Sequence, residues 1–330
     1  MNKYLTNKDF IKAEKLASER DIHISDAVAE VCSTHGEIEL LNACEVIKLV
    51  GKRPENSHKG SFGRLVLIAG SDRFPGAAQI SALAALRSGA GLVTVITTEK
   101  AAAALSVSAK EATLLPLPSD GRGFMTATTT AKEEIIETVQ KADALLIGPG
   151  LGTSAGCLEM LKIAIKNAAC PIILDADGIN LVCGRIEFLR KAKSELILTP
   201  HPAELARLCG ASLESVLEDR LHYAKDIYDT YGCTVVSKSA GTLIIDRMGI
   251  SLSVRGNNGL ARGGSGDFLA GLIASFAAQG HPAPEAAKIG VTIQGLACEA
   301  VSKRLSRRGM LPSDMINYLP LLFKKIERLI

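Results

Sequence analysis

The alternation of apolar and polar segments is most regular in the middle of the chain. Apolar runs that end in loops occur at 64–70, 92–97, 144–152, 171–177 and 195–202. Helical stretches lie between them, for example 77–91, which ends in glycine. A continuous apolar run is typical of a strand that is buried on both faces. Because strands alternate with helices, we predict an α/β fold with a mostly parallel central sheet and helices on both faces.

The pattern changes near residue 233. Three short apolar segments, 233–238, 241–246 and 250–254, follow closely on one another and predict antiparallel hairpins at one edge of the sheet. A glycine-rich segment and two long helical stretches, at about 283–306 and 312–328, come after them.

The first 50 residues are mixed and charged, and two modest helices are expected there, at 7–21 and 23–32. Residues 51–60 are polar and are typical of a linker. We therefore divide the chain into an N-terminal helical extension and linker, 1–50, and one main domain, 51–330.

Composition narrows the class of protein. The chain has 330 residues, of which 47% are hydrophobic, and a formal net charge of +3, which excludes an intrinsically disordered protein. The pI of 8.4 and the low aromatic content of 4% disfavour a nucleic-acid partner. No apolar run reaches the ~18 residues that cross a bilayer, and the first residues lack the apolar core of a signal peptide. We expect a cytoplasmic protein without a membrane partner.

The eight cysteines form no C-x-x-C pair, and neighbouring histidines do not complete a zinc spacing. Free buried thiols in a reducing compartment are the expected state. We expect no metal site built from the protein's own side chains.

The most informative segment is ARGGSGDFLAG, 261–271. Gly263, Gly264, Ser265 and Gly266 precede an apolar helix, so their backbone N–H groups and the helix N-terminus can form an anion hole. Such a turn can stabilise the charge on a phosphoryl group during transfer. Asp267, in the first helical turn, is placed to take a proton from an attacking hydroxyl. The alternative is an ordinary N-terminal acid on a core helix.

A second candidate site lies between two of the short strands. Lys238, Ser239, Ala240, Gly241 and Thr242 form a strand-end lysine followed by a glycine-containing turn, which can hold the phosphates or ribose of a nucleotide. A hairpin turn with a solvated lysine is the alternative. The sequence contains neither a Walker pattern nor a G-x-G-x-x-G turn after the first strand, so phosphate handling is expected at the later glycine-rich turn.

Further polar groups follow other strands, where open α/β sheets bind ligands. Gly152 closes a G-P-G-L-G turn that lets a ligand approach the backbone, and His201 is held between two prolines. Ala77 stands at a helix start, where close packing is the alternative role. The other strand-end candidates are Asp175, Asp177, Asn180 and Glu204.

Taken together, these segments carry a family resemblance. HKGSFGRLVLIAG, PGAAQISALAALRSGAGLVTV, ALLIGPGLG, LDADGIN, LTPHPAELARL, VVSKSAGT and GGSGDFLAG occur in this order. The set resembles the ADP/ATP-dependent NAD(P)H-hydrate dehydratases, and is most similar to bacterial members. The resemblance covers about residues 43–325.

The resemblance implies a ribokinase-like fold and the repair of (S)-NADHX and (S)-NADPHX, the hydrated forms of NADH and NADPH. In that family ADP, or ATP, phosphorylates the ring hydroxyl, and phosphate then leaves. Mg²⁺ is expected to accompany the phosphates. The resemblance also implies a homo-oligomer, with a tetramer as the expected assembly, and a functional link to a separate NAD(P)HX epimerase.

Residue roles also come from the resemblance. It implies that the hydrated dinucleotide is bound by Ala77, Gly152, His201 and Asp267, and that Asp267 is the general base. It implies that the adenine nucleotide is bound by the 238–242 segment and Gly266.

The chain departs from the family pattern at four positions. Ser239 replaces a usual Gly, and Gly178 replaces a usual Ala. Arg262 stands where Thr is common, and Ser265 stands where Thr or Met is common. Two other functions remain open: a small-molecule kinase of the same superfamily, for a sugar, thiazole alcohol or pyridoxal-like substrate, and a nucleotide-binding regulatory protein that has lost catalysis.

Overall fold

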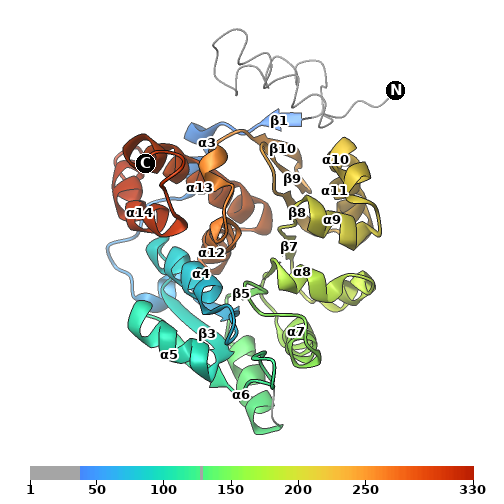
Figure 1. Cartoon of the computed structure of the whole chain (residues 1–330). Helices are drawn as coiled ribbons and strands as arrows, with labels where there is room; N and C mark the ends of the chain where they lie inside the picture. Colours follow the sequence, from blue (N-terminus) through green and yellow to red (C-terminus); the bar gives the residue numbers. More distant parts are fainter. Residues whose placement is uncertain (1–37, 127–128) are drawn as a thin grey trace.

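The computed structural model describes residues 38–126 and 129–330 and contains one ten-stranded sheet in the order β1-β10-β9-β8-β7-β6-β5-β2-β3-β4 (Figure 1). The strands are β1 (Ile38–Leu40), β2 (Arg64–Ile68), β3 (Leu92–Thr98), β4 (Thr113–Leu117), β5 (Ala144–Ile147), β6 (Ile172–Leu174), β7 (Leu196–Leu198), β8 (Thr234–Ser237), β9 (Thr242–Asp246) and β10 (Gly249–Ser253). The pairs from β8 through β4 are parallel, whereas β9 is antiparallel to both β8 and β10. The predicted parallel sheet with an antiparallel edge is confirmed.

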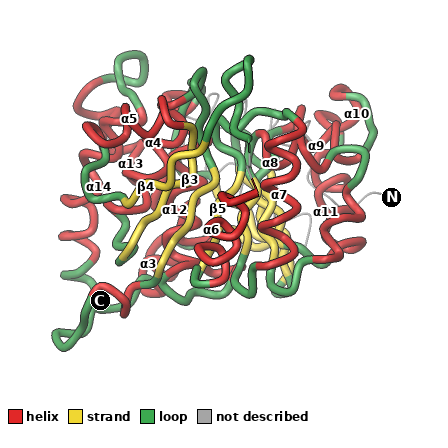
Figure 2. Tube along the Cα trace, turned by 90° about the horizontal axis from the view of Figure 1, so that it is seen from below, coloured by secondary structure: helices red, strands yellow, loops and turns green. Residues whose placement is uncertain are grey.

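Helices cover both faces of the sheet (Figure 2). One face carries α6 (Thr129–Gln140), α7 (Ala155–Asn167), α8 (Asp177–Val182), α9 (Pro202–Cys209), α10 (Leu213–Glu218) and α11 (Arg220–Tyr231). The other carries α3 (Ala43–Leu49), α4 (Pro75–Arg87), α5 (Glu99–Ser108), α12 (Ser265–Ala278), α13 (Ala283–Leu305) and α14 (Pro312–Ile326).

Strand β2 shows why its sequence reads as an unbroken apolar run. Leu65 and Leu67 face one helical layer, and Val66 and Ile68 face the other. All four are at most 3% exposed. Successive side chains of a strand point to opposite faces, so a strand between two layers needs apolar residues at every position.

Two strands of the sheet were not predicted from the sequence. β4 lies at one edge and contains Pro116, which cannot donate a ladder hydrogen bond. β1 has three residues and pairs in parallel with β10 at the opposite edge. The helices expected at 7–21 and 23–32 fall outside the described residues, and the division of the chain at residue 50 stays a prediction. Of that first stretch, β1 and α3 lie against β10 and α13.

Candidate functional site

The sheet topology gathers most of the predicted residues at one edge. Strands β8, β7, β6, β5 and β2 are neighbours in this order, and adjacent pairs are parallel. Their carboxyl ends therefore open onto the same edge of the sheet. The segments that follow them contain Lys238, His201, Asp175, Gly152 and Ala77, respectively.

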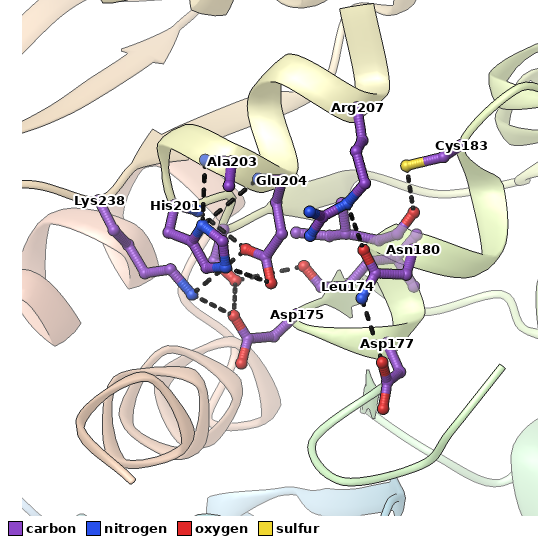
Figure 3. Close-up of polar contacts among 12 residues, drawn as sticks. Leu174, Asp175, Asp177, Asn180, Cys183, His201, Ala203, Glu204, Arg207 and Lys238 are labelled. Atoms are coloured by element: carbon purple, nitrogen blue, oxygen red, sulfur yellow. Dashed lines mark hydrogen bonds and ion pairs between the residues drawn. The ribbon is translucent and has the colours of Figure 1, made fainter. Parts of the chain in front are cut away.

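An ion pair joins the ends of β8 and β6 (Figure 3). Lys238 Nζ lies 2.6 Å from Asp175 Oδ1, and the two side chains are 18% and 2% exposed. Thr199, from the intervening strand end, donates its hydroxyl to the same Oδ1 at 2.6 Å. Asp175 is thus fixed by two donors, and Lys238 is held at the strand ends rather than extended into solvent.

His201 and Glu204 form a reciprocal cap at the start of α9 (Figure 3). The His201 N–H donates to Glu204 Oε2 at 2.8 Å, and His201 Nδ1 accepts from the N–H groups of Ala203 and Glu204 at 3.1 and 3.3 Å. Two rigid prolines and this cap fix the imidazole. Because Nδ1 is an acceptor, the neutral ring carries its proton on Nε2, 3.3 Å from Glu204 Oε1.

Burial and neighbouring charges together shift the pKa values of His201, Glu204 and Lys238. Burial lowers the pKa of His201, and the nearby cations Lys238 and Arg207 lower it further, which keeps the ring neutral. Burial raises the pKa of Glu204, partly offset by Lys238, whose Nζ is 3.9 Å away. Burial opposes the charged form of Lys238, but the carboxylates of Asp175 and Glu204 outweigh it, so the pKa of Lys238 is raised. The lysine therefore stays protonated.

The glycine-rich turn starts α12 beside this ion pair. Gly264 adopts φ +88°, a left-handed conformation suited to glycine, and no side chain caps the helix. A Cβ added at Gly266 would lie 3.4 Å from Lys238 Nζ and 3.9 Å from Asp175 Oδ2. The free N–H groups of the first turn, the helix dipole and the lysine together favour an anion here.

Asp267, in the same first turn, has a perturbed acidity. Burial raises the pKa of its carboxyl from 3.8 to about 6, and the negative charge of Asp175 adds to this, while Lys238 opposes it. Asp177 and Glu204 also raise it. A carboxylate with a pKa near the working pH is suited to general-base catalysis.

A second group of residues surrounds the loop after β5. The Gly152 N–H donates to Asp177 Oδ2 at 2.8 Å. A Cβ at Gly152 would lie 2.2 Å from the ring of Phe124, and one at Gly150 would lie 2.8 Å from the Ala77 Cβ. The predicted residues Ala77 and Gly152 therefore flank one loop, which Phe124 covers.

Two residues that depart from the family pattern have structural contacts. Arg262 directs its Nη2 to the carbonyl of Arg308 at 2.8 Å. An alanine methyl at Gly178 would lie 2.3 Å from the Ile147 carbonyl oxygen, so glycine allows α8 to approach β5. Ser239 is exposed, and Ser265 Oγ is buried without a hydrogen-bond partner among the described residues.

Sequence reasoning placed Thr199 in the strand-end Thr-Pro-His-Pro segment but did not predict its hydrogen bond to Asp175, because a single sequence does not show which strand ends are neighbours. It also missed Phe124, which lies far from Gly152 in the sequence. Within residues 38–126 and 129–330, no three His, Cys, Asp or Glu side chains are grouped so that they could hold a metal ion. In the same part of the chain, no helix is both long and apolar enough to cross a membrane.

The family profile described as NAD(P)H-hydrate dehydratase matches residues 65–321, which is more than half of the chain. The chain belongs to the NAD(P)H-hydrate dehydratase family. This confirms the family resemblance.

Two curated relatives of this family member are bifunctional NAD(P)H-hydrate repair enzymes called Nnr. The Escherichia coli protein is 34% identical over 286 residues, which cover 86% of this chain and 52% of the relative. The Moorella thermoacetica protein is 31% identical over 298 residues, or 90% of this chain and 56% of the relative. The chain thus spans about half the length of the curated relatives it matches.

Solved structures confirm the ribokinase-like fold of this family member. A ribokinase-like protein of Enterococcus faecalis has a TM-score of 0.76 and 30% identity, covering 88% of this chain and 96% of its own. The Bacillus subtilis ADP/ATP-dependent NAD(P)H-hydrate dehydratase, co-crystallised with ATP and Mg²⁺, has a TM-score of 0.74 and 28% identity, covering 88% and 99%. The hydroxyethylthiazole kinase of Pyrococcus horikoshii shares the fold, with a TM-score of 0.56 and 18% identity. The match covers 87% of this chain and 92% of the kinase.

Proposed function

We propose that this chain dehydrates the (S) hydrates of NADH and NADPH, using ADP, or ATP, as phosphoryl donor. One observation carries the proposal: the uncapped N-terminus of α12 brings Gly266 beside Lys238 and Asp175, in the turn that also holds Asp267. Membership of the NAD(P)H-hydrate dehydratase family supports the ring hydroxyl of a hydrated nicotinamide as the proposed acceptor.

The first step is a phosphoryl transfer. Asp267 takes the proton of the ring hydroxyl, whose oxygen attacks the terminal phosphoryl group of ADP, and AMP leaves. The N–H groups of Gly266 and its neighbours in the glycine turn stabilise the negative charge on the transferring group. Lys238 supplies positive charge to the donor phosphates. The 238–242 loop and Gly266 hold the adenine nucleotide.

The second step is an elimination. The carbon–oxygen bond of the ring breaks as the ring nitrogen donates electrons, and phosphate departs with the former hydroxyl oxygen. The neighbouring ring carbon then loses a proton to water, which restores the ring double bond. Hydroxide is a poor leaving group and phosphate is a much better one, which explains the need for a kinase-like first step. Ala77, Gly152 and neutral His201 hold the hydrated dinucleotide.

The chain does not provide a three-ligand metal cage among its described side chains. Asp175 and Glu204, the carboxylates nearest to Lys238, are engaged by Lys238, Thr199 and His201. Mg²⁺ is therefore proposed to arrive with the nucleotide, because Mg²⁺ is commonly bound through substrate phosphates and water. We assign no step of the reaction to the metal.

A cytoplasmic location, a tetrameric assembly and cooperation with a separate epimerase also remain proposals. Epimerisation would convert the hydrate of opposite configuration into the substrate of this reaction.

Purified protein incubated with hydrated NADH, ADP and Mg²⁺ tests the proposal. We expect the ultraviolet absorbance of reduced nicotinamide to return, with one AMP and one phosphate formed per NADH. Omitting ADP is the control. Stable phosphorylation of a sugar, thiazole alcohol or pyridoxal-like substrate, with the hydrates left untouched, would instead identify a small-molecule kinase. Nucleotide binding without either reaction would identify a regulatory protein.

A further inference from the structure

Arg220, the first residue of α11, reaches both ends of the 238–241 loop. Its Nη1 donates to the carbonyl of Ser237 at 2.8 Å, and its Nη2 donates to the carbonyl of Gly241 at 2.6 Å. Ser237 is the last residue of β8, and Gly241 directly precedes β9. One planar guanidinium thus fixes the separation of the two strand ends from which the loop projects.

The same loop has few other constraints. The Lys238 N–H donates to the Pro200 carbonyl at 2.9 Å, and Thr242 Oγ1 contacts the Ser239 carbonyl at 3.4 Å. Ser239 and Ala240 are exposed. The Lys238 side chain is held by Asp175 at 2.6 Å, and Arg220 is the side chain that bonds to the backbone on both sides of the loop.

Arg220 is also a buried cation without a matching anion. The residue is 8% exposed, and within the described part of the chain no carboxylate forms an ion pair with it. Burial lowers the pKa of its guanidinium to about 10, so it remains charged at neutral pH. Burying an unpaired charge is costly, and carbonyl dipoles offset only part of that cost. A ligand that brings negative charge to the adjoining loop would offset the rest of the free-energy cost of burying Arg220.

We propose that Arg220 is a positioning residue of the adenine-nucleotide site: it fixes both ends of the 238–241 loop, and the phosphates of the bound nucleotide supply the negative charge that this cation lacks. The inference rests on the proposed function, because it takes the 238–242 loop as the nucleotide site. Arg220 acts through the loop and does not touch the reacting atoms.

Two substitutions separate its geometry from its charge. Arg220→Lys keeps the positive charge but loses the planar pair of donors, and Arg220→Met loses both. We expect the KM for ADP to rise about tenfold in Arg220→Lys and further in Arg220→Met, since hydrogen bonds from charged groups are the stronger ones. The KM for hydrated NADH and the kcat at saturating ADP should change by less than about twofold, because the dinucleotide site lies on other loops.

Arg247→Lys and Arg247→Met are matched controls. Arg247 is 60% exposed and contacts Glu195 at 2.7 Å, away from the strand ends, so both variants should keep the wild-type KM for ADP. Calorimetric titration with ADP and thermal unfolding with and without ADP complete the set. The ADP-induced rise in Tm should shrink in the Arg220 variants.

The outcomes distinguish the two proposals. If the wild-type protein binds neither ADP nor ATP, the proposed function fails and this inference fails with it. If it binds ADP and Arg220→Lys and Arg220→Met bind ADP equally well, only the role of Arg220 is refuted. A purely structural role is shown if both KM values rise together in Arg220→Lys, and this too refutes the inference. Should Arg220→Met not fold, Arg220→Lys alone decides.

Discussion

Lys238 and Asp175 form an ion pair across an intervening strand, with 2.6 Å between Nζ and Oδ1. Lys238 follows β8 and Asp175 follows β6, and β7 lies between them. The pair therefore depends on the parallel register of three strands, and it places the positive charge next to Gly266 at the start of α12. The ion pair therefore requires these three strands to lie side by side in the sheet.

Lys238→Met should both destabilise the protein and weaken nucleotide binding. It leaves the Asp175 carboxylate, 2% exposed, without its cation, and breaking a buried pair costs about 3 kcal/mol. The double variant Lys238→Met/Asp175→Asn should recover much of this stability but not the binding of ADP. Urea unfolding and calorimetric titration measure the two effects. Equal stability of wild type and Lys238→Met would show that the pair is not coupled to folding.

Asp267→Asn should remove most of the activity while nucleotide binding persists. The amide cannot accept the hydroxyl proton, so kcat should fall by about a hundredfold to ten-thousandfold, the range for a lost general base. The affinity for ADP, measured by titration, should stay the same or rise, because a negative charge near the phosphates is removed. Full activity in this variant would exclude Asp267 as the base.

The acidity of Asp267 predicts an acid limb in the pH profile. Because the base must be ionised and its pKa is about 6, kcat/KM should rise with pH up to about that value and then level off. In Asp267→Asn, any residual activity should lack this limb. An unchanged limb in the variant would assign it to another group.

The same pKa predicts an opposite trend in stability. A carboxyl whose pKa is raised from 3.8 in the unfolded chain to about 6 in the folded one favours folding while protonated, and this contribution is lost as pH rises through about 6. Asp267→Asn should therefore have the higher Tm at pH 8, with a free energy of unfolding greater than that of the wild type by at most about 3 kcal/mol, and the gap should close toward pH 4. A lower Tm for the variant at pH 8 would contradict this.

Gly152→Ala should damage the dinucleotide site. Its Cβ would lie 2.2 Å from the Phe124 ring, and its φ is +85°, so the loop or the ring must move. The KM for hydrated NADH should rise while ADP binding is unchanged. Gly184→Ala is the control, since its φ is +72° and nothing lies within 4 Å, so it has only the conformational cost of about 1 kcal/mol. Adding Phe124→Ala to Gly152→Ala should relieve the collision with the ring but not the backbone strain at φ +85°.

The sequence predicted most of the sheet because its central strands are buried on both faces and read as unbroken apolar runs, as β2 does. It did not predict β1 and β4, because three residues, or a strand with Pro116, carry little signal at a sheet edge. Within the site, motif residues such as Lys238 and Asp267 could be named in advance. Arg220 could not, because its role depends on carbonyl groups 17 and 21 positions away that only the folded hairpin brings to it.

The most direct measurement follows the oxygen of the ring hydroxyl. Hydrated NADH carrying a heavy oxygen isotope in that hydroxyl is converted with ADP and Mg²⁺, and the mass of the released phosphate is determined. Phosphorylation by the Asp267 site followed by elimination predicts that the phosphate carries the heavy oxygen, because the ring carbon–oxygen bond is the one that breaks. Unlabelled phosphate, with the heavy oxygen in water, would contradict the account.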